Sequence, residues 1–293
     1  MGATGSSSAR LECLLWEQEV VSSNLAYPTE NRVRKHENLL TRQKEPRDVA
    51  LFNVQRNNAV TMYKAIFIDI DDTLLDYIPC CREAFLSALG ALKMENGKWT
   101  MENEDGLFDL FFAISGRLFS EAKHGLHTIA EVMDLYPAEF IEKSGLADEK
   151  MSASEVAQMT DTFKHAFRAA WGTTHTLVPE AEEMLKRLSS KGYRLFAASN
   201  SFGHLQRSRL EKAGILHYFE DTYISMDIGY DKPDIRFYQE ALRRCGLQPS
   251  EVLMIGDSMT TDVLGAQAAG IDALFFDRPG NQSLLELIQG LND

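Results

Sequence analysis

Two pairs of acidic residues stand where apolar segments of the chain end. Asp69 and Asp71 follow the apolar run AIFI, and Asp257 and Asp262 follow the run VLMIG, five residues apart. Carboxylates next to apolar strands cost free energy unless a cation or a hydrogen-bond partner compensates them. Their hard oxygen atoms are the ligands that Mg²⁺ prefers. We therefore expect Asp69, Asp257 and Asp262 to converge on one magnesium ion.

Three further polar residues follow segments that have the pattern of strands or turns. Ser199 and Asn200 come after an apolar run and offer a hydroxyl and an amide to phosphate oxygens, while Lys232 lies in a turn before a helical segment. Each signal is weak by itself, because a Ser-Asn pair is a common helix N-cap and a single lysine is usually solvated. They become informative only if the fold brings them to the acidic residues.

The elements that must position these residues alternate between strands and helices from Met62 onward. Strands are predicted at 64–69, 193–198, 222–225, 252–255 and 273–276, and helices of the same alternation at 179–191, 203–214, 234–246 and 260–270. Strand–helix repetition at this spacing predicts an α/β fold with a doubly wound parallel sheet. Ligands bind such sheets at the carboxyl ends of the strands, where the polar residues lie.

A long helical insertion separates the first predicted strand from the second. Apolar residues three and four positions apart predict helices at 79–92, 106–122, 128–143 and 152–171, with no strand between them. We therefore expect a core domain formed by residues 62–76 and 176–293, and a helical domain formed by residues 77–175.

The first 61 residues differ in composition from the remainder. They combine a small polar start, a mixed-charge run and a segment rich in Asn and Gln, without a sustained helical pattern. We expect a disordered extension or a spurious one, with Met62 as the true start. The second interpretation arises because residues 21–25 can be encoded through GTTCGAATC, a sequence typical of transfer-RNA genes.

Composition limits the class of partner. The net charge is −13, and the first 61 residues are nearly neutral, so the body of the protein is acidic. An acidic body argues against a nucleic-acid polymer as partner, although it is compatible with a small phosphorylated metabolite. No apolar run is long enough to span a membrane, no secretory signal is seen, and the four cysteines lack metal-site spacing. We expect a cytoplasmic protein without a membrane partner; the oligomeric state stays open.

Taken in their order along the chain, the polar residues that follow the predicted strands resemble the four sequence motifs of the haloacid dehalogenase superfamily. Residues 69–73 match D-x-D-x-T, Ser199 matches the second motif, Lys232-Pro233 the third, and residues 256–262 match G-D-S-x-x-x-D. The resemblance extends from residue 63 to about residue 279. It implies a Rossmann-like core with an all-helical C1 cap inserted after the first strand, and a Mg²⁺ cofactor.

The resemblance also implies a role for each residue. Asp69 would be the nucleophile that forms an aspartyl-phosphate, Asp71 the general acid and then the base, and Lys232 a fixed positive charge near the phosphoryl group. Thr73 would hold Asp71 or its loop in place. The expected phosphate-binding residues are Thr73, Ser199, Asn200 and Lys232, and the expected metal ligands are Asp69, Asp257, Asp262 and the backbone carbonyl of Asp71. Loss of a halide needs no proton, so the acid at position 71 favours phosphoryl chemistry over dehalogenation.

The substrate class is less strongly indicated. Residues 195–229 resemble the pyrimidine 5′-nucleotidase branch, so we expect a nucleoside 5′-monophosphate. The alternatives are a sugar-phosphate or phosphoglycolate phosphatase, a phosphomutase, or a non-catalytic protein that binds a phosphorylated ligand. A signalling receiver domain is excluded, because its phosphorylated acid follows a middle strand and no helical insertion follows its first strand.

Candidate substrate-facing residues occur in the insertion. The cationic candidates are Arg82, Arg117, Lys123, His124 and His127, each expected to be a solvated helix residue. The aromatic candidates are Phe108, Phe111, Phe112 and Phe119, for which we expect core packing rather than stacking on a base.

Overall fold

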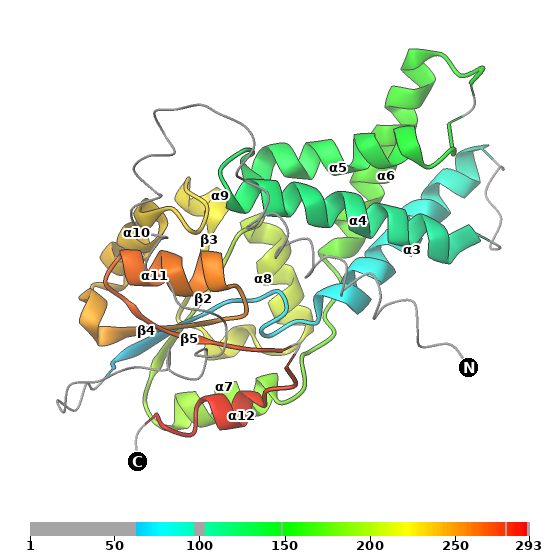
Figure 1. The fold of residues 1–293 in the computed structure, drawn as a ribbon. Coiled ribbons are helices and arrows are strands. Elements are labelled where there is room, and N and C mark those ends of the chain that lie inside the picture. The colour runs from blue at the N-terminus through cyan, green and yellow to red at the C-terminus, as the bar shows by residue number, and fades with distance from the viewer. Residues whose placement is uncertain (1–62, 97–102, 148, 279, 292–293) are drawn as a thin grey trace, which may run out of the picture. The chain divides into compact units, whose positions relative to one another are not determined.

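The computed structural model describes residues 63–96, 103–147, 149–278 and 280–291. The predicted N-terminal extension lies outside these residues. Five parallel strands form one sheet in the order β3-β2-β1-β4-β5 (Figure 1). The strands are β1 (Ala65–Ile68), β2 (Arg194–Ser199), β3 (Asp221–Ile224), β4 (Val252–Gly256) and β5 (Asp272–Phe275). The predicted doubly wound parallel sheet is confirmed.

The register of the central strands explains how distant polar residues meet. β1 lies between β2 and β4, and Ile68 pairs with Ala197 on one side and with Ile255 on the other. The chain order along the sheet reverses at β1, which makes the gap beyond its carboxyl end a topological switch point. Asp69 is the first residue after β1 and therefore stands at this point.

Helices cover both faces of the sheet. α10 (Ile235–Cys245) and α11 (Gly265–Ala268) lie on one face, and α7 (Ala181–Ser190) and α12 (Leu284–Leu287) lie on the other (Figure 1). The first face holds an apolar core that joins the strands to α10 and includes Phe67 and Phe237. The described core also contains α8 (Gly203–Lys212), α9 (Ser225–Ile228) and two 3-10 turns, Leu216–Tyr218 and Pro249–Glu251.

The predicted helix at 260–270 is wrong in its details. The structure has a π-helical segment, Met259–Leu264, followed by the single turn α11. The side chain of Ser258 begins this segment by accepting a hydrogen bond from the backbone N–H of Thr261. π-helical turns are rare and occur often at functional sites, and this one carries Asp262.

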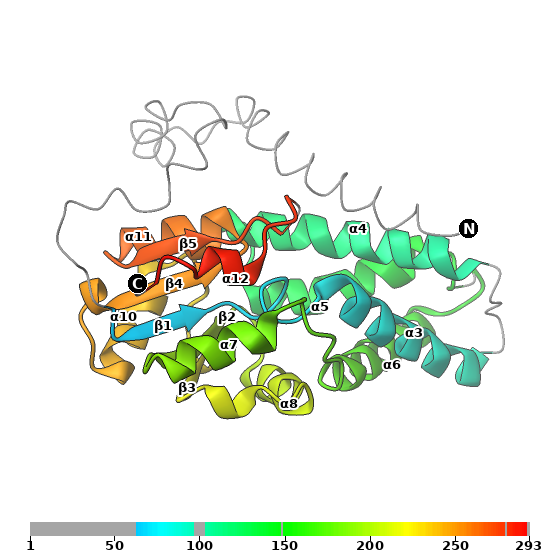
Figure 2. The same cartoon turned by 90° about the horizontal axis from the view of Figure 1, so that it is seen from below.

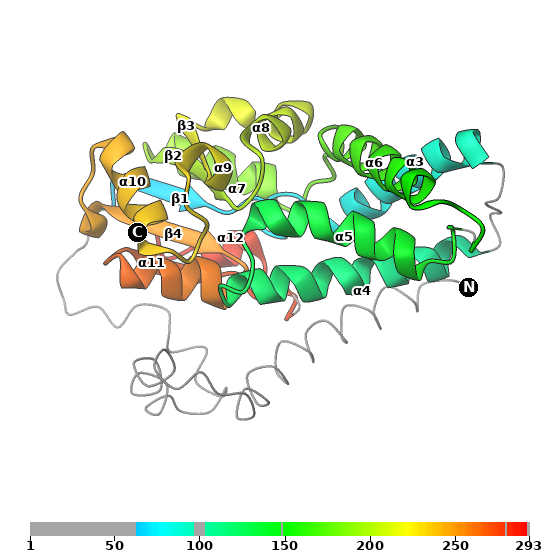
Figure 3. The same cartoon turned by 90° about the horizontal axis from the view of Figure 1, so that it is seen from above.

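The described residues of the insertion form four helices, which make up the predicted cap. They are α3 (Tyr77–Asn96), α4 (Glu104–Lys123), α5 (Ile129–Lys143) and α6 (Ala153–Trp171). Ser and Thr capping boxes begin α6 and α5, as their sequences S-x-x-E and T-x-x-E predict. α3 packs on α6 and α4 on α5 (Figures 2 and 3). Buried rings that include Phe85, Phe111, Phe140 and Phe163 give the cap an apolar core.

Two chain segments join the cap to the core, and they run side by side. Leu75 forms a β-bridge with Leu177, and the backbone N–H of Asp76 donates to the carbonyl of Thr176. The exact domain boundaries stay a prediction. Among the helices that the structure describes, none is both long and apolar enough to cross a membrane.

Candidate active site

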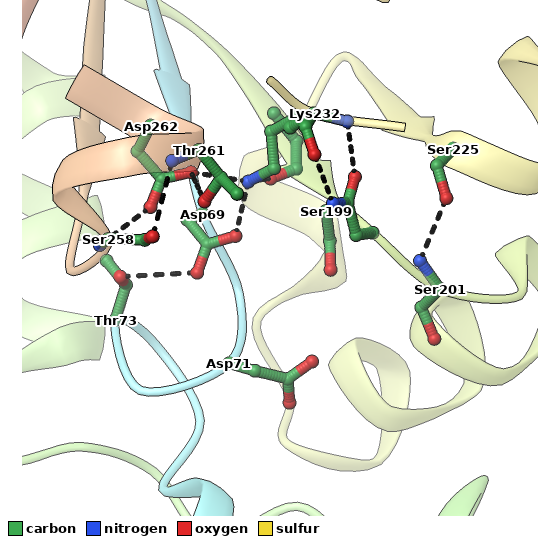
Figure 4. Close-up of polar contacts among 12 residues, drawn as sticks. Asp69, Asp71, Thr73, Ser199, Ser201, Ser225, Lys232, Ser258, Thr261 and Asp262 are labelled. Carbon is green, nitrogen blue, oxygen red and sulfur yellow. Dashed lines mark hydrogen bonds and ion pairs between the residues drawn. The ribbon is translucent and has the colours of Figure 1, made fainter. Parts of the chain in front are cut away.

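A buried lysine links two of the predicted site acids. The Lys232 ammonium donates to Asp69 Oδ1 at 2.7 Å, to Asp262 Oδ1 at 2.6 Å and to the carbonyl of Ala198 at 2.8 Å (Figure 4). Only 3% of Lys232 is exposed to solvent. The lysine that sequence alone would leave on the surface therefore lies at the centre of the cluster.

A third acid completes the cluster. Asp69, Asp257 and Asp262 each present a carboxylate oxygen, and these oxygens lie within 4.8 Å of one another. The backbone N–H of Ser258 holds Asp262 by donating to its Oδ2 at 3.0 Å. Gly256 ends β4 directly against the Asp262 side chain, and a Cβ there would collide with the carboxylate. This close approach explains why glycine precedes Asp257.

Burial disfavours the charged form of the carboxylates in this cluster. Desolvation raises the pKa of Asp69 to about 7, against the opposing charge of Lys232. The pKa of Asp257 is raised well above its usual range, chiefly by desolvation and then by the charges of Asp69 and Asp262. Burial by itself would lower the pKa of Lys232, but the neighbouring carboxylates outweigh it and raise this pKa. One ammonium does not compensate three converging carboxylates.

The donor set fits a divalent cation. Three carboxylate oxygens converge, from the ends of β1 and β4 and from the π-helical segment, and a hard cation with oxygen ligands would supply the positive charge that they lack. The Asp71 carboxylate is not part of this group, and its carbonyl oxygen as a ligand stays a prediction.

Asp71 lies apart from Asp69 and Asp262 (Figure 4), and it has hydrogen-bond partners of its own. Its Oδ1 accepts a hydrogen bond from Arg209 Nη1 at 2.6 Å, and its Oδ2 accepts from Gln206 Nε2 at 2.7 Å. Both donors lie on α8 and are completely buried. The sequence interpretation missed them, although Gln206 and Arg209 share a helical face with the apolar Leu205 and Leu210, which is an available signal.

The structure shows the partners of three neighbouring polar residues. Thr73 is buried and its hydroxyl donates to Asp69 Oδ2 at 3.4 Å, so it contacts the predicted nucleophile and not Asp71. The Asn200 amide exchanges two hydrogen bonds with the backbone of Lys232, at 2.7 and 2.8 Å. Because both ends of this amide are engaged, Asn200 holds the loop that carries Lys232, and its role in binding phosphate stays a prediction. Ser199 Oγ accepts from Gln206 Nε2 at 2.9 Å.

Most of the cationic candidates in the cap have partners within the cap itself. Arg82 pairs with Glu104 and Asp105, Arg117 pairs with Glu121 and Glu139, His127 pairs with Glu121, and His124 contacts the carbonyl of Ser120. Lys123 differs from them, since its charge acts on Asp257 and lowers the pKa of that carboxyl, against the larger effect of burial. Phe108 and Phe111 are buried in the cap core, and Phe112 and Phe119 pack against it, as expected.

Comparison with known proteins decides the family. A model of haloacid dehalogenase-like hydrolases matches residues 63–270. The chain belongs to this family. The predicted superfamily is thereby confirmed, and together with the phosphatases named below the match confirms a phosphoric monoester hydrolase of the haloacid dehalogenase type. A solved structure of the HAD-hydrolase YfnB from Bacillus subtilis, with bound magnesium, has the same fold as this hydrolase: the TM-score is 0.65 at 23% identity, over 79% of this chain and 100% of that one.

Three characterised relatives of this haloacid dehalogenase-like hydrolase differ in the extent of their similarity. A glyceraldehyde 3-phosphate phosphatase of Methanothermobacter thermautotrophicus is 32% identical over 217 residues, 73% of this chain and 85% of the relative. A phosphoserine phosphatase of Thermus thermophilus is 30% identical over 231 residues, 73% of this chain and 89% of the relative. The pyrimidine 5′-nucleotidase PynA of Streptococcus pneumoniae is 36% identical, but over 98 residues only, 33% of this chain and 41% of the relative.

Proposed function

We propose that this chain is a magnesium-dependent phosphatase that hydrolyses a small alkyl phosphomonoester, of the sugar-phosphate or phosphoserine kind, through a phosphorylated Asp69. The observation that carries the proposal is the contact of Asp69 with Lys232, beside the carboxylates of Asp257 and Asp262. A carboxylate nucleophile must approach a negatively charged phosphate, so positive charge is needed beside it. Lys232 supplies one such charge, and the three carboxylates are suited to bind a cation that would supply more.

The residues divide the reaction between them. Asp69 attacks the phosphorus atom in line and forms an acyl phosphate while the alcohol departs. Lys232 stays next to Asp69 and stabilises the negative charge of the transferring group. Magnesium, when bound to Asp69, Asp257 and Asp262, would neutralise charge on the nucleophile and on the phosphate.

Asp71 carries the proton in both halves of the proposed reaction. It first protonates the alcohol oxygen as that group departs, and the resulting carboxylate then removes a proton from the water that hydrolyses the acyl phosphate. Ser199 lies at the same edge and is suited to bind a phosphate oxygen, since its hydroxyl can donate while it accepts from Gln206.

The substrate class rests on the extent of the similarities. Phosphatases for a triose phosphate and for phosphoserine match about three quarters of the chain, whereas the nucleotidase matches one third. The four cap phenylalanines that were candidates for stacking on a base pack in or against the cap core. The sugar-phosphate alternative is therefore better supported than the nucleoside monophosphate that residues 195–229 suggested.

A substrate panel tests this proposal. Phosphate release would be measured with Mg²⁺ for triose, pentose and hexose phosphates, phosphoglycolate, phosphoserine and nucleoside 5′-monophosphates. We expect the highest kcat/KM for a sugar phosphate or phosphoserine. A nucleoside monophosphate as the best substrate would overturn the substrate class, and no release from any ester would overturn the proposed activity.

Magnesium is expected to stabilise the folded protein. An ion present at a hundred times its dissociation constant contributes about 2.7 kcal/mol, which raises the thermal midpoint of a unit of this size by about 5–10 °C. Calorimetry in Mg²⁺ and in EDTA would measure the difference. Asp257→Asn should abolish most of the shift. Asp272→Asn is the matched control, because Asp272 begins β5 and instead accepts a hydrogen bond from Tyr63. Equal shifts in both variants would contradict the assigned ligands.

A further inference from the structure

A buried arginine contacts the predicted general acid from the core helix α8. Arg209 is completely buried, and its Nη1 donates both to Asp71 Oδ1 and to Gln206 Oε1, at 2.6 and 2.7 Å. Asp71 itself is about one quarter exposed. A fixed, fully desolvated guanidinium therefore holds a carboxylate that still reaches the accessible side of the site.

Gln206 ties the same carboxylate to the predicted phosphate-binding residue. Its Nε2 donates to Asp71 Oδ2 at 2.7 Å and to Ser199 Oγ at 2.9 Å. Because one nitrogen serves both acceptors, the Asp71 carboxylate and the Ser199 hydroxyl stand side by side. Asp71 is thereby kept beside the residue that is proposed to bind the phosphate.

Arg209 also contacts the segment through which the cap returns to the core. Its Nε donates to the carbonyl of Thr174 at 3.2 Å, and its guanidinium lies 3.9 Å from the ring centroid of Trp171, the last residue of α6. Trp171 in turn packs against Tyr77, the first residue of α3. The end of α6 thus contacts the side chain that holds Asp71 directly, and the start of α3 is linked to it through Trp171.

The stability of the fold does not by itself explain why a charged arginine is buried at position 209. Arg209 Nη2 is buried and has no hydrogen-bond partner among the described residues. Buried ion pairs often contribute no more to folding than apolar residues of similar size, and an unpaired buried donor adds a cost. A functional role explains the arginine better.

We propose that Arg209, together with Gln206, is a positioning residue that holds the general acid Asp71 beside the phosphate site and links its orientation to the ends of the cap. This inference rests on the proposed function, because it assigns Asp71 the proton transfer to the leaving alcohol. Arg209 acts through Asp71 and does not touch the substrate.

The test uses two aromatic esters that differ in their need for a proton. Benzyl phosphate releases an alcohol that must be protonated, whereas p-nitrophenyl phosphate releases a stabilised phenolate that departs without a proton. kcat/KM is the informative constant, because it covers the steps up to departure of the leaving group. Asp71→Asn provides the reference, and we expect it to lower kcat/KM for benzyl phosphate by about 10²-fold or more and to affect p-nitrophenyl phosphate much less.

Arg209→Met should reproduce this pattern in weaker form. We expect a loss of about 10–100-fold for benzyl phosphate and less than about threefold for p-nitrophenyl phosphate. Combined with Asp71→Asn, it should cause little further loss, because residues that act as a unit are not additive. Gln206→Met tests the same contact independently, and Arg209→Lys should restore part of the activity. Arg207→Met is the matched control, since Arg207 lies on the same helix and pairs with Asp227.

The outcomes separate the inference from the proposed function. Equal losses for both esters, or losses that add to those of Asp71→Asn, would mean that Arg209 is only structural and would overturn the inference. If Asp71→Asn distinguishes the two esters and neither Arg209→Met nor Gln206→Met does, the inference fails and the proposed function stands. If the unmodified protein hydrolyses neither ester nor any member of the substrate panel, the proposed function fails first.

Discussion

Asp69→Asn is expected to lower kcat by about 10⁴-fold or more, because removal of a nucleophile eliminates the covalent route. Asparagine keeps the size of the side chain but cannot form the acyl phosphate. The variant should remain folded, since desolvation already disfavours the charge of Asp69 and Lys232 keeps its contact with Asp262. Phosphate release under saturating substrate, together with mass spectrometry of acid-quenched enzyme for a phosphorylated Asp69 peptide, would measure both effects.

Asp72→Asn is the matched control for this substitution. Asp72 lies in the same loop, yet its carboxylate pairs with Arg278 and accepts a hydrogen bond from the backbone of Tyr77. Its φ of 62° is left-handed, a conformation that asparagine tolerates. We expect activity within a few-fold of the unmodified protein. Asp69→Asn with activity similar to that of Asp72→Asn would contradict the nucleophile assignment.

Lys232→Met is expected to reduce both activity and stability. The loss of a fixed positive charge next to the transferring phosphoryl group should lower kcat by about 10²–10³-fold. The substitution also leaves the buried carboxylates of Asp69 and Asp262 without their shared partner. Breaking a buried ion pair in this way costs about 3–5 kcal/mol, which corresponds to a thermal midpoint lower by about 6–20 °C in metal-free buffer.

An exposed lysine provides the comparison for this second prediction. Lys186 lies on the solvent side of α7, and Lys186→Met should change neither kcat nor the thermal midpoint appreciably. Lys232→Met with unchanged stability would show that the buried carboxylates do not depend on the ammonium. Unchanged kcat would remove Lys232 from the proposed mechanism, even if the protein were destabilised.

The sequence by itself determined the fold and the grouping of the acids. Asp69 and Asp257 directly follow apolar strands, and parallel strands end at the same edge of a sheet, so covalent adjacency places both carboxylates there. Helical periodicity likewise predicted the four cap helices, because their apolar stripes must be buried whatever their partners are. The catalytic roles of these residues stay predictions.

Only the tertiary structure decided which partners the other polar side chains have. Asn200 contacts the backbone of Lys232, and Thr73 contacts Asp69, although a phosphate or Asp71 would have been equally compatible with their residue types. The apolar residues on the same helical face indicate that Gln206 and Arg209 are buried, but the two become partners of Asp71 only because α8 packs against the end of α6. Such contacts depend on how helices distant in sequence are rotated and docked, and residue type and spacing do not specify this.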